Sequence, residues 1–249
     1  MGVKSSTQNT FIYFELGRTS LQCLRFYNII KYWLKLCHSL DVKYTKQVYN
    51  QLLRCIEVQP NKLTWATQVR DLLARYGFYH VWLQHSVGNP KLFLQAVKQR
   101  IHDVDVQVLN DTISNSTRAL FYRTISQFEF SLYLDVIQVK KYRTAMSRLR
   151  LSSHRLAVES GRWHKPLPIP FIERKCTICN VLQDEFHFVI ECNLFKDLRN
   201  RYISRYFWLH PNYFKFTQLL ATHNEADIKK LSIFVFKAFE RLDTFNRIF

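Results

Sequence analysis

Residues that form tight turns are scarce in this sequence. Glycine occurs 5 times and proline 6 times among 249 residues. Because these two residues interrupt helices and occupy many turns, their scarcity favours long helices joined by few tight turns. Hydrophobic residues make up 47% of the chain, which is enough for a substantial core.

Long apolar runs are also missing. No stretch has the length and apolarity of a membrane-spanning helix, and the N-terminal segment MGVKSSTQNT lacks the apolar centre of a secretory signal. We therefore expect an intracellular protein, nuclear or cytoplasmic. Because those compartments are reducing, the 6 cysteines are expected to be free thiols or metal ligands.

Acidic residues are few in comparison with basic ones. The chain has 19 Asp and Glu against 36 Lys and Arg, which gives a net charge of +17. Such an excess indicates a polyanionic partner, most simply nucleic acid, either RNA or DNA. An anionic membrane surface is the weaker alternative, and we expect no membrane partner.

The positions of the apolar residues predict a mainly α fold. Leucine, valine, isoleucine and aromatic residues recur at intervals of three and four through most of the chain. Asn89 followed by Pro90 and Asn224 before a periodic segment are helix starts by their capping chemistry. In the first half of the chain, helices are predicted over 19–40, over 45–58 and between Pro60 and Gly77. Further helices are predicted to begin at Asn89 and at Ser116, to cover 128–137 and 193–208, and to begin at Asn224.

Three of the cysteines lie in one short stretch, CTICNVLQDEFHFVIEC at 176–192. Two residues separate Cys176 from Cys179, so a tight turn can present both thiolates to one ion. Four residues separate His187 from Cys192, which is about one helical turn, so this pair can also converge. Three thiolates and one imidazole fill the tetrahedral coordination of zinc, which predicts a structural zinc site. The alternative is two buried cysteines, a surface histidine and an isolated thiol.

Basic side chains are concentrated just before this stretch. Residues 140–175 contain many lysines and arginines but only Glu159 and Glu173 as acids. Leucines can bury one side of this segment while the arginines project from the other, where they would hold phosphates without reading sequence. The predicted phosphate contacts are Arg143, Arg148, Arg150, Arg155, Arg162 and Lys165, with Tyr142 and Trp163 as residues that stack on a base.

Together these features predict a multi-helix bundle with a small zinc-knuckle module near the C-terminus. We expect four segments along the chain. They are a disordered leader over 1–14, a helical domain over 15–138, a basic helical arm with the CCHC knuckle over 139–209, and a C-terminal helical segment over 210–249.

Several segments resemble one protein family in the same order. They are ELGR at 15–18, IIKYWLKL at 29–36, GFYHVWLQ at 77–84, LRLSSHRLAVESGRW at 149–163 and the cysteine-rich stretch at 176–192. They resemble the region that follows the reverse transcriptase domain in LINE-like, non-LTR retrotransposon polyproteins of animals. The resemblance implies a helical extension with a CCHC zinc knuckle that binds template RNA or target DNA, beside an upstream or trans-acting reverse transcriptase.

No pattern in the sequence indicates catalysis. Polymerases of this family carry two adjacent aspartates for two metal ions, and no Asp-Asp pair occurs in the chain. The sequence also lacks the His-x-Glu of zinc deaminases. Asp184 and Glu185 are interpreted as solvated acids on a turn, with support of a metal ligand as the alternative.

The sequence therefore predicts a non-catalytic, zinc-stabilised nucleic-acid-binding module of retrotransposon origin. Two alternatives remain at this point. One is a helical scaffold whose basic face binds an acidic protein, and the other is a non-functional retrotransposon remnant.

Overall fold

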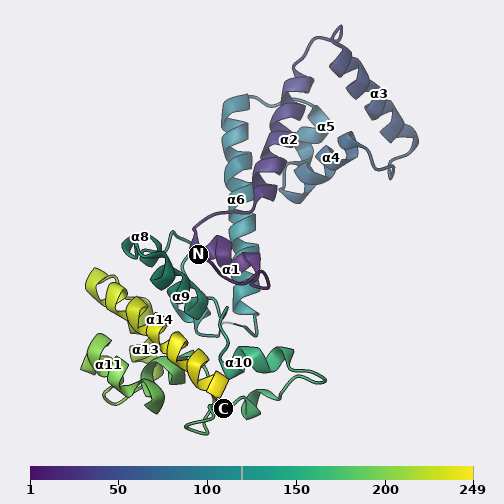
Figure 1. Ribbon diagram of the computed structural model, residues 1–249. Coiled ribbons are helices and arrows are strands. Elements are labelled where there is room, and N and C mark those ends of the chain that lie inside the picture. The colour runs from purple at the N-terminus through teal and green to yellow at the C-terminus, as the bar shows by residue number, and fades with distance from the viewer. Residues whose placement is uncertain (119, 249) are drawn as a thin grey trace. The chain divides into compact units, whose positions relative to one another are not determined.

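The structure is a computed structural model that describes residues 1–118 and 120–248 (Figure 1). Its regular elements are helices, and within the described residues there is no strand, only two isolated β-bridges. This confirms the mainly α fold. The chain forms two compact units: unit 1 contains Met1–Arg18 and Asp111–Phe249, and unit 2 contains Thr19–Asn110.

Unit 2 is built around aromatic side chains. Its helices are α2 (Leu21–Cys37), α3 (Tyr44–Val58), α4 (Trp65–Arg75), α5 (Tyr79–Gln84) and the first part of α6 (Pro90–Ser114). Trp33 is fully buried, donates a hydrogen bond from Nε1 to the Tyr49 hydroxyl at 2.8 Å, and stacks on Trp82. These three side chains come from α2, α3 and α5, so one cluster of rings holds three helices together.

The helix starts and stops in unit 2 agree with the capping chemistry of the sequence. Asn89 Oδ1 accepts hydrogen bonds from the backbone amides of Lys91 and Leu92, as an N-cap before a proline should. Gly77 follows α4 with φ of +83°, a left-handed conformation that favours glycine at a helix end. Both predictions are confirmed.

Unit 1 contains the remaining elements. Its α-helices are α1 (Asn9–Glu15), α7 (Tyr122–Ile125), α8 (Tyr133–Val136), α9 (Lys140–Arg150), α10 (Ala157–Ser160), α11 (Lys196–Tyr202), α12 (Arg205–Trp208), α13 (Tyr213–Leu220) and α14 (Glu225–Ile248). Four short turns complete it: η1 (Gly161–Trp163), η2 (Phe171–Glu173), η3 (His187–Glu191) and η4 (Asn193–Phe195). In its core α9 packs against α14, with Met146 and Leu149 buried in the same cluster as Phe234 and Val235 (Figure 1).

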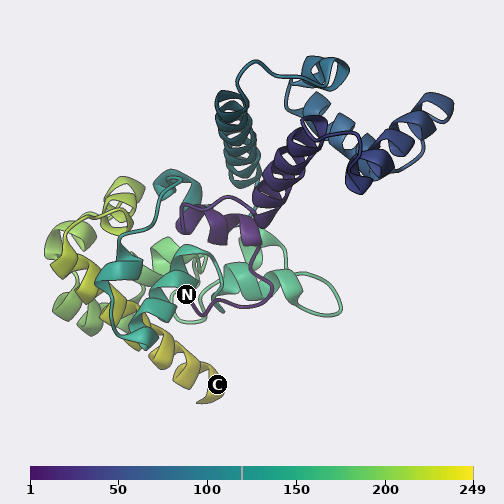
Figure 2. The ribbon, with the colours of Figure 1, turned by 90° about the horizontal axis from the view of Figure 1, so that it is seen from above.

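The N-terminal segment is not a disordered leader. Residues 9–15 form α1, and Phe11 and Phe14, three positions apart on one face, are both buried. The ring of Phe11 meets Tyr122 edge-on at 5.5 Å, and the Lys4 amide donates to Ser153 Oγ. The segment therefore lies among the helices of unit 1 (Figure 2).

The unit boundaries also differ from the four predicted segments. The predicted boundaries after 138 and 209 both fall inside unit 1, whose single core includes α9 and α14. Composition located the basic segment, but it carried no signal for which helices share a core. The predicted N-terminal domain is likewise divided, because residues 19–110 form unit 2 and residues 15–18 and 111–138 belong to unit 1.

Candidate metal centre and the basic residues around it

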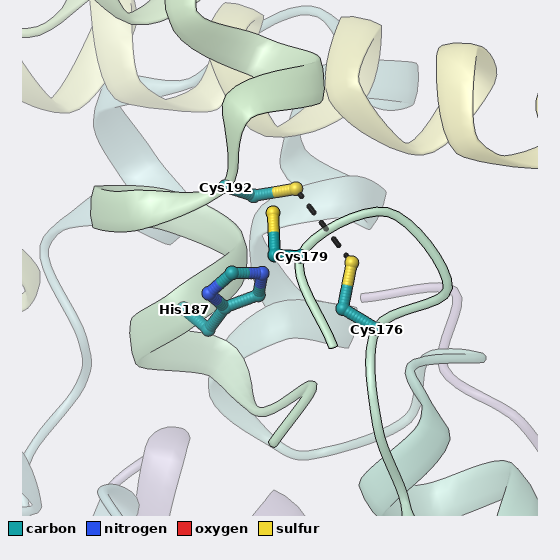
Figure 3. A group of neighbouring side chains, drawn as sticks. All are labelled: Cys176, Cys179, His187 and Cys192. Carbon is teal, nitrogen blue, oxygen red and sulfur yellow. Dashed lines mark hydrogen bonds between the residues drawn. The ribbon is translucent and has the colours of Figure 1, made fainter. Parts of the chain in front are cut away.

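Four side chains predicted to bind metal converge in unit 1. The ligand atoms of Cys176, Cys179, His187 and Cys192 all lie within 4.8 Å of one another (Figure 3). The Sγ atoms of Cys176 and Cys192 are 4.0 Å apart. Two sulfurs bound to one tetrahedral zinc ion lie about 3.8 Å apart, because each Zn–S bond is about 2.3 Å long. The cluster could therefore hold a metal ion, and its sulfur and nitrogen donors suit zinc.

A tight turn presents the first two cysteines. The Cys176 amide donates to the Val181 carbonyl at 2.7 Å, and the Asn180 amide donates to the Cys176 carbonyl at 2.8 Å. Asn180 has φ of +54°, a left-handed conformation that asparagine tolerates better than most residues. The turn folds the chain back on itself, so Cys179 lies near Cys176 in space.

A single wide turn presents the other two ligands. His187–Glu191 is a π-helical turn in which the Cys192 amide donates to the His187 carbonyl at 2.8 Å. Such turns are rare and are often found at functional sites. The five-residue spacing brings Cys192 back over His187, and Asp184 Oδ1 accepts a hydrogen bond from the His187 amide at 2.8 Å.

The imidazole of His187 is buried with neither ring nitrogen in a hydrogen bond. Its Nδ1 lies 3.5 Å from Glu191 Oε2, and Figure 3 shows the other ring nitrogen facing the sulfurs. Buried polar atoms without partners are costly, so this arrangement fits a ring that binds metal through one nitrogen. Glu191 would then hold the opposite nitrogen, as carboxylates do for many metal-bound histidines.

The electrostatics of the thiols favour a bound cation. A hydrogen bond between the two buried thiols lowers the pKa of Cys176 to about 3 and raises the pKa of Cys192 above its ordinary value. Burial alone would lower the pKa of His187, but the Cys176 and Glu191 side chains outweigh burial and raise it. The lowered pKa favours the thiolate form of Cys176, which is the form that binds metal.

The cluster is embedded in the core of unit 1. Cys176 and Cys192 are each 2% exposed and belong to the same hydrophobic cluster as α9 and α14. Arg199 is buried and donates from Nη2 to the Cys192 carbonyl at 2.7 Å and from Nε to the Val189 carbonyl at 3.0 Å. A bound ion would therefore stabilise the whole unit and not a peripheral knuckle.

Two acids beside the cluster are buried and not solvated. Asp184 and Glu185 are 8% and 7% exposed. Glu185 Oε1 accepts hydrogen bonds from Ser152 Oγ at 2.5 Å and from His154 Nε2 at 2.9 Å. The segment SSHR therefore contacts the metal-binding stretch directly. A polar Ser-Ser-His run between buried leucines was the one sequence signal for such a partner.

The predicted phosphate contacts separate into three groups. Arg148, Arg155 and Lys165 are exposed, and of these Arg148 donates from Nε to the Gly2 carbonyl at 2.9 Å. Arg143 and Arg162 are half-buried and also donate hydrogen bonds to backbone carbonyls. Arg150 is buried and bound to Glu15 and the Leu220 carbonyl, so it does not lie on a phosphate-binding face.

The two predicted stacking residues also differ. Trp163 is 66% exposed, with the Arg118 guanidinium 6.0 Å from the centre of its ring. Tyr142 packs edge-on against Phe236 at 5.3 Å, within the core that joins α9 to α14. Of the two, Trp163 is the ring with a large accessible surface.

No family model, curated protein or solved structure matches this chain. In the part of the chain that the structure describes, none of the helices has the length and apolarity needed to cross a bilayer. The retrotransposon resemblance and nucleic-acid binding stay predictions.

Proposed function

We propose that this protein is a non-catalytic nucleic-acid-binding module held in shape by one structural zinc ion. We further propose that it derives from the region after the reverse transcriptase domain of a LINE-like retrotransposon. The observation that carries the proposal is the convergence of three cysteines and one histidine within 4.8 Å, just after the most basic segment of the chain. Four protein ligands leave no open coordination position, so the metal would stabilise the fold and perform no chemistry.

The crowding of basic side chains in unit 1 supports a polyanionic partner. The pKa of Lys4 is lowered by burial and by the nearby positive charges of Arg155, Arg148 and Arg118. Lys4 is 150 positions from His154 in sequence, yet its Nζ donates to the His154 carbonyl at 2.7 Å. Folding thus brings together cations that repel one another, and a phosphate backbone would relieve that repulsion.

The salt dependence of binding tests this function. The full chain, purified with its metal, is titrated into labelled single-stranded RNA and DNA at several salt concentrations. We expect the logarithm of the affinity to fall linearly with the logarithm of salt concentration, because bound counterions are released from the phosphates. A flat salt response, or no binding to either polymer, would contradict the proposal.

One feature favours a second candidate, a protein-interaction scaffold. In unit 2 the side chains of Leu21 and Leu24 on α2 are 79% and 58% exposed, and they border a groove lined also by Tyr32 and Trp65. Apolar surface of this kind often binds another protein. A competition experiment with RNA separates the two candidates. RNA should displace a partner protein that binds the basic residues of unit 1, but it should not displace a partner protein that binds this groove.

A further inference from the structure

Unit 1 contains a pocket of about 400 Å³ between the basic segment and the metal-binding stretch. Three separate segments bring aromatic side chains to it: Phe121 precedes α7, Phe171 lies in η2 and Tyr213 begins α13. Phe171 and Tyr213 are 42% and 59% exposed. The volume lies within the range of small-molecule sites, and aromatic walls with a few polar groups are typical of such sites.

Carboxylates also line this pocket. Asp184 is more than nine-tenths buried, and its only hydrogen bond among the described residues is the one that Oδ1 accepts from the His187 amide. Oδ2 has no protein partner among those residues and is not one of the fully buried atoms that lack one, so it is accessible from the pocket. Glu185 and Glu159 line the pocket as well. A ligand that fills the pocket would exclude water from this Asp184 oxygen and would need to bring an N–H or O–H donor to it.

Cationic side chains border the same pocket. Arg162 is held by Glu159 at 3.0 Å and by the Thr117 carbonyl. Arg123 also lines the pocket, is exposed, and has no hydrogen bond or ion pair with any residue that the structure describes. A guanidinium without a protein partner at the edge of an aromatic pocket is placed to bind an anion attached to the ligand.

We propose that this pocket binds one unpaired base of a single-stranded nucleic acid, with Arg123 on a neighbouring phosphate. The proposal rests on the proposed function and gives it a specific site. Nucleobases are flat rings that stack on aromatic side chains, and each of the four presents at least one N–H donor on its pairing edge. An apolar peptide side chain would fill the volume but would leave the Asp184 acceptor unpaired.

The site is separate from the surface predicted from the sequence. Only Arg162 of the predicted contacts lines the pocket, whereas Arg148, Arg155 and Lys165 do not. The pocket residues thus bind the base while the other cations follow the backbone, a division of roles common to proteins that bind single strands. Unpairing is required because the pairing edge of a base in a duplex is occupied.

A comparison of strands with and without bases tests the proposal. Fluorescence anisotropy measures binding of the full, metal-loaded chain to a ten-nucleotide single strand, to an abasic strand with the same phosphates, and to a blunt duplex of the same sequence. Stacking of one base contributes roughly 1–3 kcal/mol, so we expect the normal strand to bind about 5- to 150-fold more tightly than the abasic one. Equal affinity for the two single strands, or tighter binding to the duplex, would overturn the proposal.

Variants locate the effect. Thr124 is exposed, lines the pocket and donates its hydroxyl to the Phe121 carbonyl, so Thr124→Trp should fill the pocket and abolish most of the preference for bases. Thr244→Trp is the matched control, because Thr244 is also an exposed helical threonine bonded to a backbone carbonyl, that of Glu240. Phe171→Ala removes one exposed aromatic wall of the pocket and should also reduce the preference for the normal strand over the abasic one. It provides a second test in case the tryptophan of Thr124→Trp disturbs folding.

The charge variants complete the design. Arg123→Gln should weaken binding to normal and abasic strands alike, and by more than Lys230→Gln, which removes an exposed charge outside the pocket. If Thr124→Trp and Phe171→Ala both keep the full preference for bases, the pocket is not the site and the proposal is wrong, although nucleic-acid binding itself stands. If no strand binds at any salt concentration, the proposed function itself has failed.

Discussion

Arg150 and Glu15 are 135 positions apart in the sequence and form a two-point ion pair inside unit 1. Arg150 Nε lies 2.5 Å from Glu15 Oε1, and Nη2 lies 3.4 Å from Oε2. The two residues are 9% and 1% exposed, and the Tyr122 hydroxyl donates to the same carboxylate at 2.6 Å. The pair connects α1 to the end of α9, so it fastens the N-terminal helix to the core of unit 1.

Removing one partner of this pair should destabilise the protein strongly. Arg150→Met leaves the Glu15 carboxylate buried without its counter-ion, and such losses cost about 3–5 kcal/mol. Denaturant unfolding of the full chain measures the change. Tyr122→Phe, which removes one hydrogen bond to the same carboxylate, should cost less, about 1.5–3 kcal/mol. Equal stability of Arg150→Met and the parent chain would contradict the buried pair.

Replacing exposed arginines of the basic segment should change nucleic-acid binding and not stability. Arg148→Gln and Arg155→Gln should leave stability nearly unchanged and should each reduce the slope of log affinity against log salt by about 1 if the arginine contacts a phosphate. Arg201→Gln, an exposed residue of α11 outside the segment, is the matched control. A slope that is the same in all three variants and the parent would place the nucleic acid on another face.

The metal ligands should stabilise unit 1 selectively. Cys192→Ser removes a ligand that is 2% exposed, and structural zinc sites contribute on the order of 10 kcal/mol to folding, so unit 1 should lose more than about 3 kcal/mol. Hydrogen exchange should rise throughout the core of unit 1, including α9 and α14, while Trp33 and its neighbours in unit 2 keep their protection. Cys55→Ser, on the exposed side of α3, should change neither unit.

A second ion pair gives a prediction about acid. The hydrogen bond from Arg241 lowers the pKa of Asp197 from 3.8 to about 2. A carboxyl whose pKa is lower in the folded state stabilises the fold above its unfolded pKa and loses that contribution as pH falls. Asp197→Asn should therefore reduce the loss of stability between pH 4 and pH 2, by less than about 1 kcal/mol because the pair is exposed. Thermal unfolding at those pH values measures the difference.

The sequence was informative wherever local chemistry decides structure. Asn89, Gly77 and Asn224 mark helix ends because caps need only a few neighbouring backbone groups, and each lies where the sequence predicted. The convergence of Cys176, Cys179, His187 and Cys192 was predicted from their spacing for the same reason. Their convergence needs one tight turn and one π-helical turn, both set within seventeen positions of the chain.

What sequence could not supply were contacts between distant segments. In the sequence, Arg150 is one of several arginines in a basic segment, and nothing nearby indicates that it is buried. Its ion-pair partner, Glu15, is far away in the sequence. Glu185 was interpreted as solvated for the same reason, because its partners Ser152 and His154 lie more than thirty positions earlier. The two units likewise follow from which helices pack together, and a bundle assigned by periodicity alone does not specify that.

X-ray absorption at the zinc edge, combined with the metal content of the purified chain, tests the central claim most directly. We predict one zinc ion per chain with three sulfurs at about 2.3 Å and one nitrogen at about 2.0–2.1 Å. The ion should be lost in Cys192→Ser and retained in Cys55→Ser. A purified, folded chain with no bound metal, or with a shell of oxygen ligands in place of sulfur, would contradict the account.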